Sequence, residues 1–186
     1  MQDFLDQTSR HRAAFEQFCL SLTEEELARP VPRSAWDVKA YIAHLGTIDT
    51  TVRTWFERLL GDGGAAQAPT ADGASGRAFD IDRWNEAQVA ARADWSLEQI
   101  LEEMRSNRAA LDAVVARFTP EVLDGEMHFP GDRDRPPAQV HVGGYLQALA
   151  LHDPAHALDM LRALPEKADD PELADWLGPF RSMLPG

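Results

Sequence analysis

The chain has 186 residues, a mass of 20.7 kDa and a formal net charge of −13, from 18 Lys and Arg against 31 Asp and Glu. That length corresponds to about one domain, and the negative charge opposes binding to nucleic acid or to anionic membrane surfaces. The one cysteine, Cys19, cannot form an intramolecular disulfide, and no apolar run approaches the roughly 20 residues of a membrane span. The amino terminus lacks the order of a signal peptide. We therefore expect a cytoplasmic protein, either a monomer or a homodimer.

Apolar residues recur at helical spacing along most of the chain, and no segment alternates with period two. The first helix is predicted over 3–20, with Cys19 as a small core residue. The second helix is predicted to begin at Ser34, where Asp37 stands at the capping-box position, and to run to Leu60.

The remaining segments complete a helical domain. In chain order they are a mobile Gly- and Ala-rich loop over 61–77, a short helix over 80–92, a helix over 96–118 that opens with a Ser96–Gln99 capping box, an irregular Pro-rich connector over 119–137, and a last long helix over 139–164. Residues 165–186 form an acidic tail that packs on or near the bundle, with a weak turn around Trp176. Four long helices joined by breaks predict an all-α four-helix bundle over 1–164, with a short additional helix and a C-terminal tail.

Three of the six histidines fall on the apolar sides of these helices. His44 follows Tyr41 by three residues on the second helix, and the inward positions of the last helix are Val142, Tyr145, Leu149, His152, His156 and Met160. A buried imidazole needs a hydrogen bond, a charged partner or a metal. Histidines at i and i+4 lie about 6 Å apart along one helix face, a spacing that lets both bind one ion. The pattern predicts a metal site at His44, His152 and His156, with two singly satisfied or exposed histidines as the alternative for the last pair.

Pro154 lies between these two histidines and removes one backbone donor from the helix. We expect a kinked but continuous helix, because the apolar stripe keeps its register across the proline. If the helix instead restarted with Asp153 as N-cap, His152 and His156 would no longer share a face.

The other three histidines lie elsewhere. His141 is eleven residues from His152, about 16 Å along a helix, and is expected at a helix start. His11 is expected to be exposed near the terminus. His128, in the connector, is a candidate substrate contact or extra ligand if that segment folds over the site.

Three segments resemble the DinB/YfiT-like superfamily of metal-binding helical bundles, in the branch related to mycothiol-dependent maleylpyruvate isomerases and thiol S-transferases. They are WDVKAYIAHL (36–45), DIDRWNEAQVAAR (80–92) and ALHDPAHALDML (150–161), and the resemblance covers most of 1–164. It implies a divalent metal, zinc or nickel, held by His44, His152 and His156. It also implies, for some members, transfer of a low-molecular-weight thiol to an electrophile or thiol-dependent isomerisation.

In the isomerase branch that this chain resembles, the last helix carries a Glu-x-x-x-His motif. This chain has His152-x-x-x-His156 instead, so the resemblance does not imply maleylpyruvate as its substrate. The resemblance places polar pocket groups at Asn85 and Arg83. Asp153 lies beside a ligand and is a candidate for orienting an imidazole, with a solvent-facing or capping role as the alternative.

Three imidazoles leave at least one coordination position open, as in catalytic zinc sites. The leading hypothesis is that a small-molecule thiol of the mycothiol or bacillithiol type becomes a thiolate there and attacks a small electrophile. Asn107 and Arg108 interrupt an apolar stripe and are candidates to face this pocket, although Arg108 also fits a snorkelling side chain. Two alternatives remain: a metal-dependent hydrolase, for which the inward faces offer no convincing acidic base, and a non-catalytic, stress-related metal-binding bundle.

Overall fold

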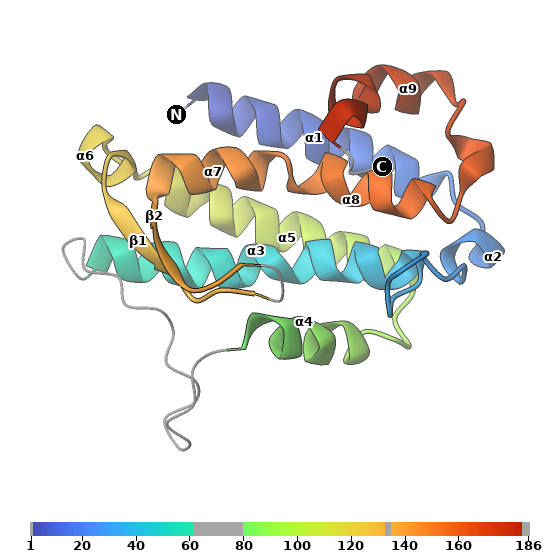
Figure 1. The fold of residues 1–186 in the computed structure, drawn as a ribbon, viewed down its shortest axis with the longest axis horizontal. Helices are drawn as coiled ribbons and strands as arrows, with labels where there is room; N and C mark the ends of the chain where they lie inside the picture. Colours follow the sequence, from blue (N-terminus) through green and yellow to red (C-terminus); the bar gives the residue numbers. More distant parts are fainter. Residues whose placement is uncertain (1, 62–79, 133–134, 184–186) are drawn as a thin grey trace.

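The computed structural model describes residues 2–61, 80–132 and 135–183, and its main architecture is a bundle of four long helical elements. These are α1 (Gln2–Leu20), α3 (Val38–Gly61), α5 (Leu97–Val115) and the consecutive pair α7 (Val142–Ala150) and α8 (His152–Leu161), which run lengthwise together (Figure 1). The all-α four-helix prediction is confirmed. Within the described residues, no helix combines the length and apolar character required to cross a bilayer.

Shorter elements connect or cover the bundle. They are α2 (Glu24–Leu27), α4 (Ile81–Ala90), which lies against α3, α6 (Pro120–Leu123), β1 (Glu126–Phe129), β2 (Ala138–His141), the 3-10 turn η1 (Pro165–Lys167), α9 (Pro171–Leu177) and the 3-10 segment η2 (Gly178–Met183). The predicted loop at 61–77 falls, from residue 62 on, outside the described residues.

Side-chain caps fix where several helices begin, α5 and α3 among them. The Ser96–Gln99 capping box at the start of α5 is present in both directions, as predicted. The predicted start of α3 at Ser34 is wrong. A bridge between Pro30 and Asp37 holds the preceding residues as a turn, and the Asp37 carboxylate accepts the Ala40 N–H at 2.8 Å to begin the helix.

The connector and the start of the last helix contain a short antiparallel hairpin that the sequence reading did not predict. β1 pairs with β2 with Glu126 opposite His141, and Met127 and Phe129 turn toward the core. Two strands of four residues are too short to display period-two alternation above the helical background. At Gly131 the backbone has φ +87°, and a Cβ there would lie 2.8 Å from the Pro137 nitrogen, so this turn requires glycine.

The last helix is not continuous, contrary to expectation. α7 ends at Ala150, and the Leu151 N–H turns back to the Ala148 carbonyl at 3.1 Å. α8 then begins at His152, so Pro154 lies in its first turn, where the missing N–H costs no intrahelical bond. Because His152 and His156 both belong to α8, they keep the i, i+4 spacing and share a face despite the break.

The C-terminal segment packs on the bundle. Leu173 and Leu177 of α9 are buried in the same cluster as Phe15 of α1. Trp176 donates from Nε1 to His11 Nδ1 at 3.0 Å, so the expectation that His11 is exposed is wrong. Cys19 is fully buried in this cluster, as predicted.

The core is divided into two apolar clusters with polar side chains between them. One cluster joins the start of α3 to α8, and the other joins the end of α3 to α7 and the hairpin. Each long element carries one buried charged residue at the boundary: Arg12 on α1, Asp49 on α3, Arg108 on α5 and Asp153 on α8. The three predicted metal ligands lie on two of these elements, His44 on α3 and the other two on α8.

Candidate metal centre

His44 is positioned by the most buried stretch of α3. Its neighbours Ile42 and Leu45 are fully buried, and the residue itself is 5% exposed. The indole of Trp36 packs on the imidazole, with ring centroids 5.0 Å apart. Packing against Trp36 and the burial of the surrounding stretch of α3 thus hold the ring in place.

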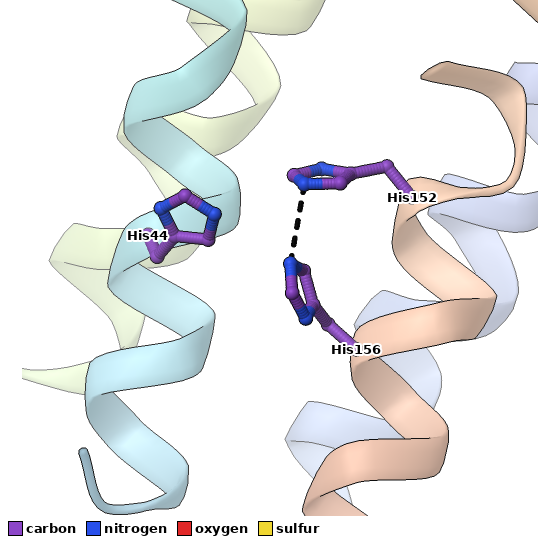
Figure 2. A group of neighbouring side chains, drawn as sticks. All are labelled: His44, His152 and His156. Carbon is purple, nitrogen blue, oxygen red and sulfur yellow. Dashed lines mark hydrogen bonds between the residues drawn. The ribbon is translucent and has the colours of Figure 1, made fainter. Parts of the chain in front are cut away.

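His152 and His156 project from consecutive turns of α8 toward His44 on α3 (Figure 2). Their ring centroids lie 5.4 and 5.2 Å from that of His44 and 4.5 Å from each other. The Nε2 atoms of His152 and His156 approach to 3.1 Å. One nitrogen from each of the three rings lies within 4.8 Å of the others, so the structure brings the three predicted ligands together.

The lowered pKa values of His44 and His152 suit a cation. Burial, followed by the proximity of His156, lowers the pKa of His44 to about 3. Burial and then the charges of His156 and His44 also hold the pKa of His152 well below its ordinary value. The Nδ1 atoms of His44 and His152 are buried without a hydrogen-bond partner among the described residues. Neutral imidazoles with buried, unsatisfied nitrogens fit a divalent metal.

Asp159 is a neighbour of the site that the sequence reading missed. Its Oδ2 lies 3.2 Å from Nδ1 of His156, the contact by which carboxylates orient metal-binding imidazoles and direct Nε2 toward the ion. The signal was available as His156-x-x-Asp159, because residues three apart on a helix face each other.

A cavity of about 350 Å³ adjoins the three imidazoles. This volume lies at the small end of the range typical of ligand pockets, about 300–1,000 Å³. Besides the histidines, its walls include the apolar or aromatic Trp36, Ile48, Ile81, Phe129, Tyr145 and Leu149 and the polar Asp82, Asn85, Asp132 and Arg135. Burial raises the pKa of Tyr145, so this phenol remains a hydrogen-bond donor at the cavity wall.

The residues predicted to surround the metal site divide into two groups. Asn85 lines the cavity, and its Oδ1 is buried without a partner among the described residues. Arg83 is exposed on α4 and outside the described cavity walls. His128 is half-buried on β1 next to Phe129, and since alternate strand residues face opposite sides, the two side chains point apart. Of these three, only Asn85 meets the cavity.

Asp153 faces neither solvent nor an imidazole. It receives two hydrogen bonds from Arg12, at 2.8 and 3.0 Å, and lies 3.9 Å from Arg108. Arg108 in turn donates to Asp49 at 3.0 Å, so it does not face the cavity. Asn107 donates to the Gly46 carbonyl at 2.8 Å and is also absent from the described cavity walls.

Together Arg12, Asp49, Arg108 and Asp153 form a buried charge quartet that links all four long elements. Its side chains are between 0 and 7% exposed. Burial raises the pKa of Asp153, but the charges of Arg12 and Arg108 outweigh this effect, so the pKa lies below its ordinary value. The quartet was not predicted as a unit, although Arg108 was noted as an interruption of an apolar stripe.

The fold and the histidine cluster define a helical bundle with a candidate metal centre between two antiparallel elements. The chain belongs to the DinB superfamily, whose sequence profile matches residues 7–160. The predicted family resemblance is therefore confirmed. No curated protein matches the sequence.

Solved structures show the same fold at low sequence identity. The mycothiol-dependent maleylpyruvate isomerase is 12% identical with a TM-score of 0.64, over 95% of this chain and 66% of that one. A mutant of that enzyme is 10% identical with a TM-score of 0.62, over 86% and 60% of the respective chains. YfiT from Bacillus subtilis, described as a probable metal-dependent hydrolase with an unusual four-helix bundle topology, is 14% identical with a TM-score of 0.60, over 95% and 87%. This chain thus spans about two thirds of the isomerase and most of YfiT.

Proposed function

We propose that this protein is a divalent-metal-dependent enzyme that transfers a low-molecular-weight thiol to a small electrophile, or uses the thiol to isomerise one. The observation that carries the proposal is the convergence of His44, His152 and His156 beside a cavity of about 350 Å³. The fold shared with a mycothiol-dependent isomerase supports a thiol as co-substrate. Zinc or nickel is the proposed ion, because imidazole nitrogens suit both.

The chain offers no thiol of its own for this chemistry. Cys19 is fully buried in the core, and burial raises the pKa of its thiol well above the ordinary value. A thiol that is both inaccessible and protonated is a poor nucleophile. The sulfur must therefore come from a bound small molecule.

The side chains around the site would bind and orient the reactants. A cation held by three imidazoles supplies an open position that lowers the pKa of a thiol or a water. The carboxylate of Asp82, at the cavity wall, is the candidate acceptor for the thiol proton. The sulfur lone pair then forms a bond to the electrophilic carbon, and the leaving group departs with the bonding electron pair.

Turnover assays of the purified protein test this proposal. Monochlorobimane serves as the electrophile, with mycothiol, bacillithiol or glutathione as the thiol, and metal content is measured alongside. We expect thiol-dependent turnover that a chelator abolishes and that His156→Ala reduces by at least about 100-fold, since a missing ligand disables the site. His128→Ala is the matched control, because it removes a histidine outside the cavity. Turnover that survives chelation would contradict the proposal.

A metal-dependent hydrolase is the second candidate. Asp82 lines the same cavity as the histidines and is a candidate acidic base from α4, whereas the expectation concerned the inward faces of the long helices. The similarity in fold to YfiT supports this class as well. Ester hydrolysis without any thiol would favour the hydrolase, and tight metal binding with no turnover of either kind would leave a non-catalytic metal-binding protein.

We also propose a cytoplasmic location, where low-molecular-weight thiols stay reduced. The reactants are then small molecules rather than nucleic acid or membrane, in keeping with the net charge of −13. Gel filtration decides between the monomer and the homodimer.

A further inference from the structure

The β1–β2 hairpin has a polar outer face. Glu126 lies opposite His141, and His128 lies opposite Gln139. Because alternate residues of a strand face opposite sides of a sheet, these four side chains share one face and Phe129 belongs to the other. Phe129 is buried in the apolar cluster that includes residues of α3 and α7, so the four polar side chains face away from the bundle. We name these four residues the outer hairpin face.

The residue pairs on this face are of the closely spaced kind. The Val142 N–H donates to the Gly125 carbonyl at 3.0 Å, which continues the β1–β2 register by one position as a hydrogen-bonded pair. Hydrogen-bonded and non-hydrogen-bonded pairs alternate along an antiparallel ladder. Glu126 with His141, and the pair two positions further on, are therefore non-hydrogen-bonded, and their Cα atoms lie about 4.5 Å apart rather than about 5.5 Å.

Three members of the outer hairpin face carry the donor atoms that first-row cations prefer. Imidazole nitrogen and carboxylate oxygen both bind zinc, at about 2.0–2.2 Å. Glu126 stands opposite His141 and two residues before His128, so it neighbours both histidines on this face. The two histidines are diagonal neighbours across the strands, a separation of about 7–8 Å that long and aromatic side chains can span. One cation above the face can thus be reached from both strands.

These side chains are available to a ligand but are not yet gathered around one point. His141 is the N-cap of α7, although its imidazole makes no capping hydrogen bond, and Glu126 is exposed. Within the parts of the chain that the structure describes, donor atoms of three such residues already lie together only at His44, His152 and His156. Binding at the outer hairpin face therefore requires surface side chains to rotate, and the entropy lost in ordering them makes this the weaker site.

We propose that the outer hairpin face is a second metal site, in which His128, His141 and Glu126 bind one exchangeable first-row dication. Zinc, nickel and copper(II) all suit imidazole donors. Three protein ligands leave at least one coordination position to solvent. The site does not depend on the proposed function, because the ion is bound on the side of the hairpin opposite Phe129, which lines the cavity.

Zinc titration of the metal-free protein by isothermal titration calorimetry tests this site. We expect two zinc ions per chain, the second binding at least about tenfold more weakly than the first. His128→Ala and His141→Ala should each retain the first ion and weaken the second by at least about tenfold, with circular dichroism confirming an unchanged fold. Gln139→Ala is the matched control on the same face, and it should change either affinity by less than about threefold.

Nuclear magnetic resonance locates the second ion. The second equivalent of zinc should shift the imidazole resonances of His128 and His141. An ion bound from both strands should also slow amide exchange in the hydrogen-bonded pair Met127–Val140 by at least about threefold, and His141→Ala should abolish that protection. Unchanged exchange at the second equivalent would overturn binding from both strands.

The two proposed metal sites can fail separately. One zinc ion that is lost in His156→Ala and kept in His128→Ala would overturn the hairpin site alone, as would a second ion whose affinity is unaltered in both His128→Ala and His141→Ala. One ion that is kept in His156→Ala and lost in His128→Ala would remove the centre between α3 and α8 and leave the hairpin site. No zinc binding at all would overturn both.

Discussion

The buried charge quartet makes the stability of the bundle depend on Asp153. Asp153→Asn keeps the shape of the side chain but removes its charge. Arg12 then loses the partner of its two shortest charged contacts, 2.8 and 3.0 Å. Within the quartet, both arginines would then share the single carboxylate of Asp49, at 3.3 Å from Arg12 and 3.0 Å from Arg108. We therefore expect a net positive charge buried at the boundary of the two apolar clusters.

The magnitude follows from the burial. Removing one partner from a buried ion pair costs about 3–5 kcal/mol, and the Asp153 side chain is only 3% exposed. For a chain of this length about 1 kcal/mol corresponds to a change of roughly 2–4 °C in Tm. Asp153→Asn should therefore lower the Tm by roughly 6–20 °C.

Urea and thermal unfolding, followed by circular dichroism on metal-free protein, measure this change without interference from the metal site. Glu102→Gln is the matched control, because Glu102 is 76% exposed in its pair with Arg105, and exposed pairs contribute about 0–1 kcal/mol. The double variant Arg12→Leu with Asp153→Leu removes one charge of each sign and leaves Arg108 with Asp49. It should be more stable than the sum of its single variants implies. Strict additivity, or a loss as small as that of Glu102→Gln, would refute the reasoning.

Three further predictions concern the histidine cluster. The folded-state pKa values of His44 and His152 are lowered. Below the unfolded histidine pKa of about 6.5, the unfolded chain therefore binds more protons than the folded one. The metal-free protein should lose stability as pH falls from about 6.5 toward 3, by about 1.4 kcal/mol per pH unit for His44. Urea titrations at pH 7, 6 and 5 check this slope, and His44→Asn should flatten it. Chelation should lower the Tm by roughly 5–11 °C if the free ion stands at about 100 times its Kd, since that occupancy stabilises by about 2.7 kcal/mol; an unchanged Tm in differential scanning calorimetry would count against a metal site. Asp159→Asn should weaken metal binding by about 10–100-fold without changing the fold. Competition with a chromogenic chelator measures this affinity. An unaltered affinity would mean that the contact with Asp159 does not orient the imidazole of His156.

The helices were predictable because their signals are local. The capping box at Ser96 lies within four residues, and the apolar stripes repeat every turn. The hairpin was not predictable in this way, since Glu126 pairs with His141 across fifteen positions and each strand alone is four residues long. The start of α3 failed for the same reason, because the bridge from Pro30 to Asp37 overrides the local preference for a cap at Ser34.

The convergence of the histidines was predictable from spacing, whereas the charge quartet was not. An imidazole on an apolar stripe stands out as a polar residue that requires a partner, and the i, i+4 pair supplies one within the same helix. The four members of the quartet lie on four different elements. In the sequence, each is therefore only a single charged residue within a helix, with no partner nearby to mark it as buried. Arg12 and Asp153 are 141 positions apart, and only the folded bundle brings them together.

The break at Leu151 connects these two features. Successive residues of a helix point about 100° apart, so the first two residues of α8 face different parts of the molecule. His152 faces the cavity with His44, while Asp153 faces Arg12 in the core. The short turn between α7 and α8 therefore sets the directions of two side chains, those of His152, a proposed metal ligand, and of Asp153, a member of the buried charge quartet. Any change that lets the start of α8 rotate should disturb the ion pair and the histidine cluster together, which is why metal affinity and unfolding free energy should fall in parallel in Asp153→Asn.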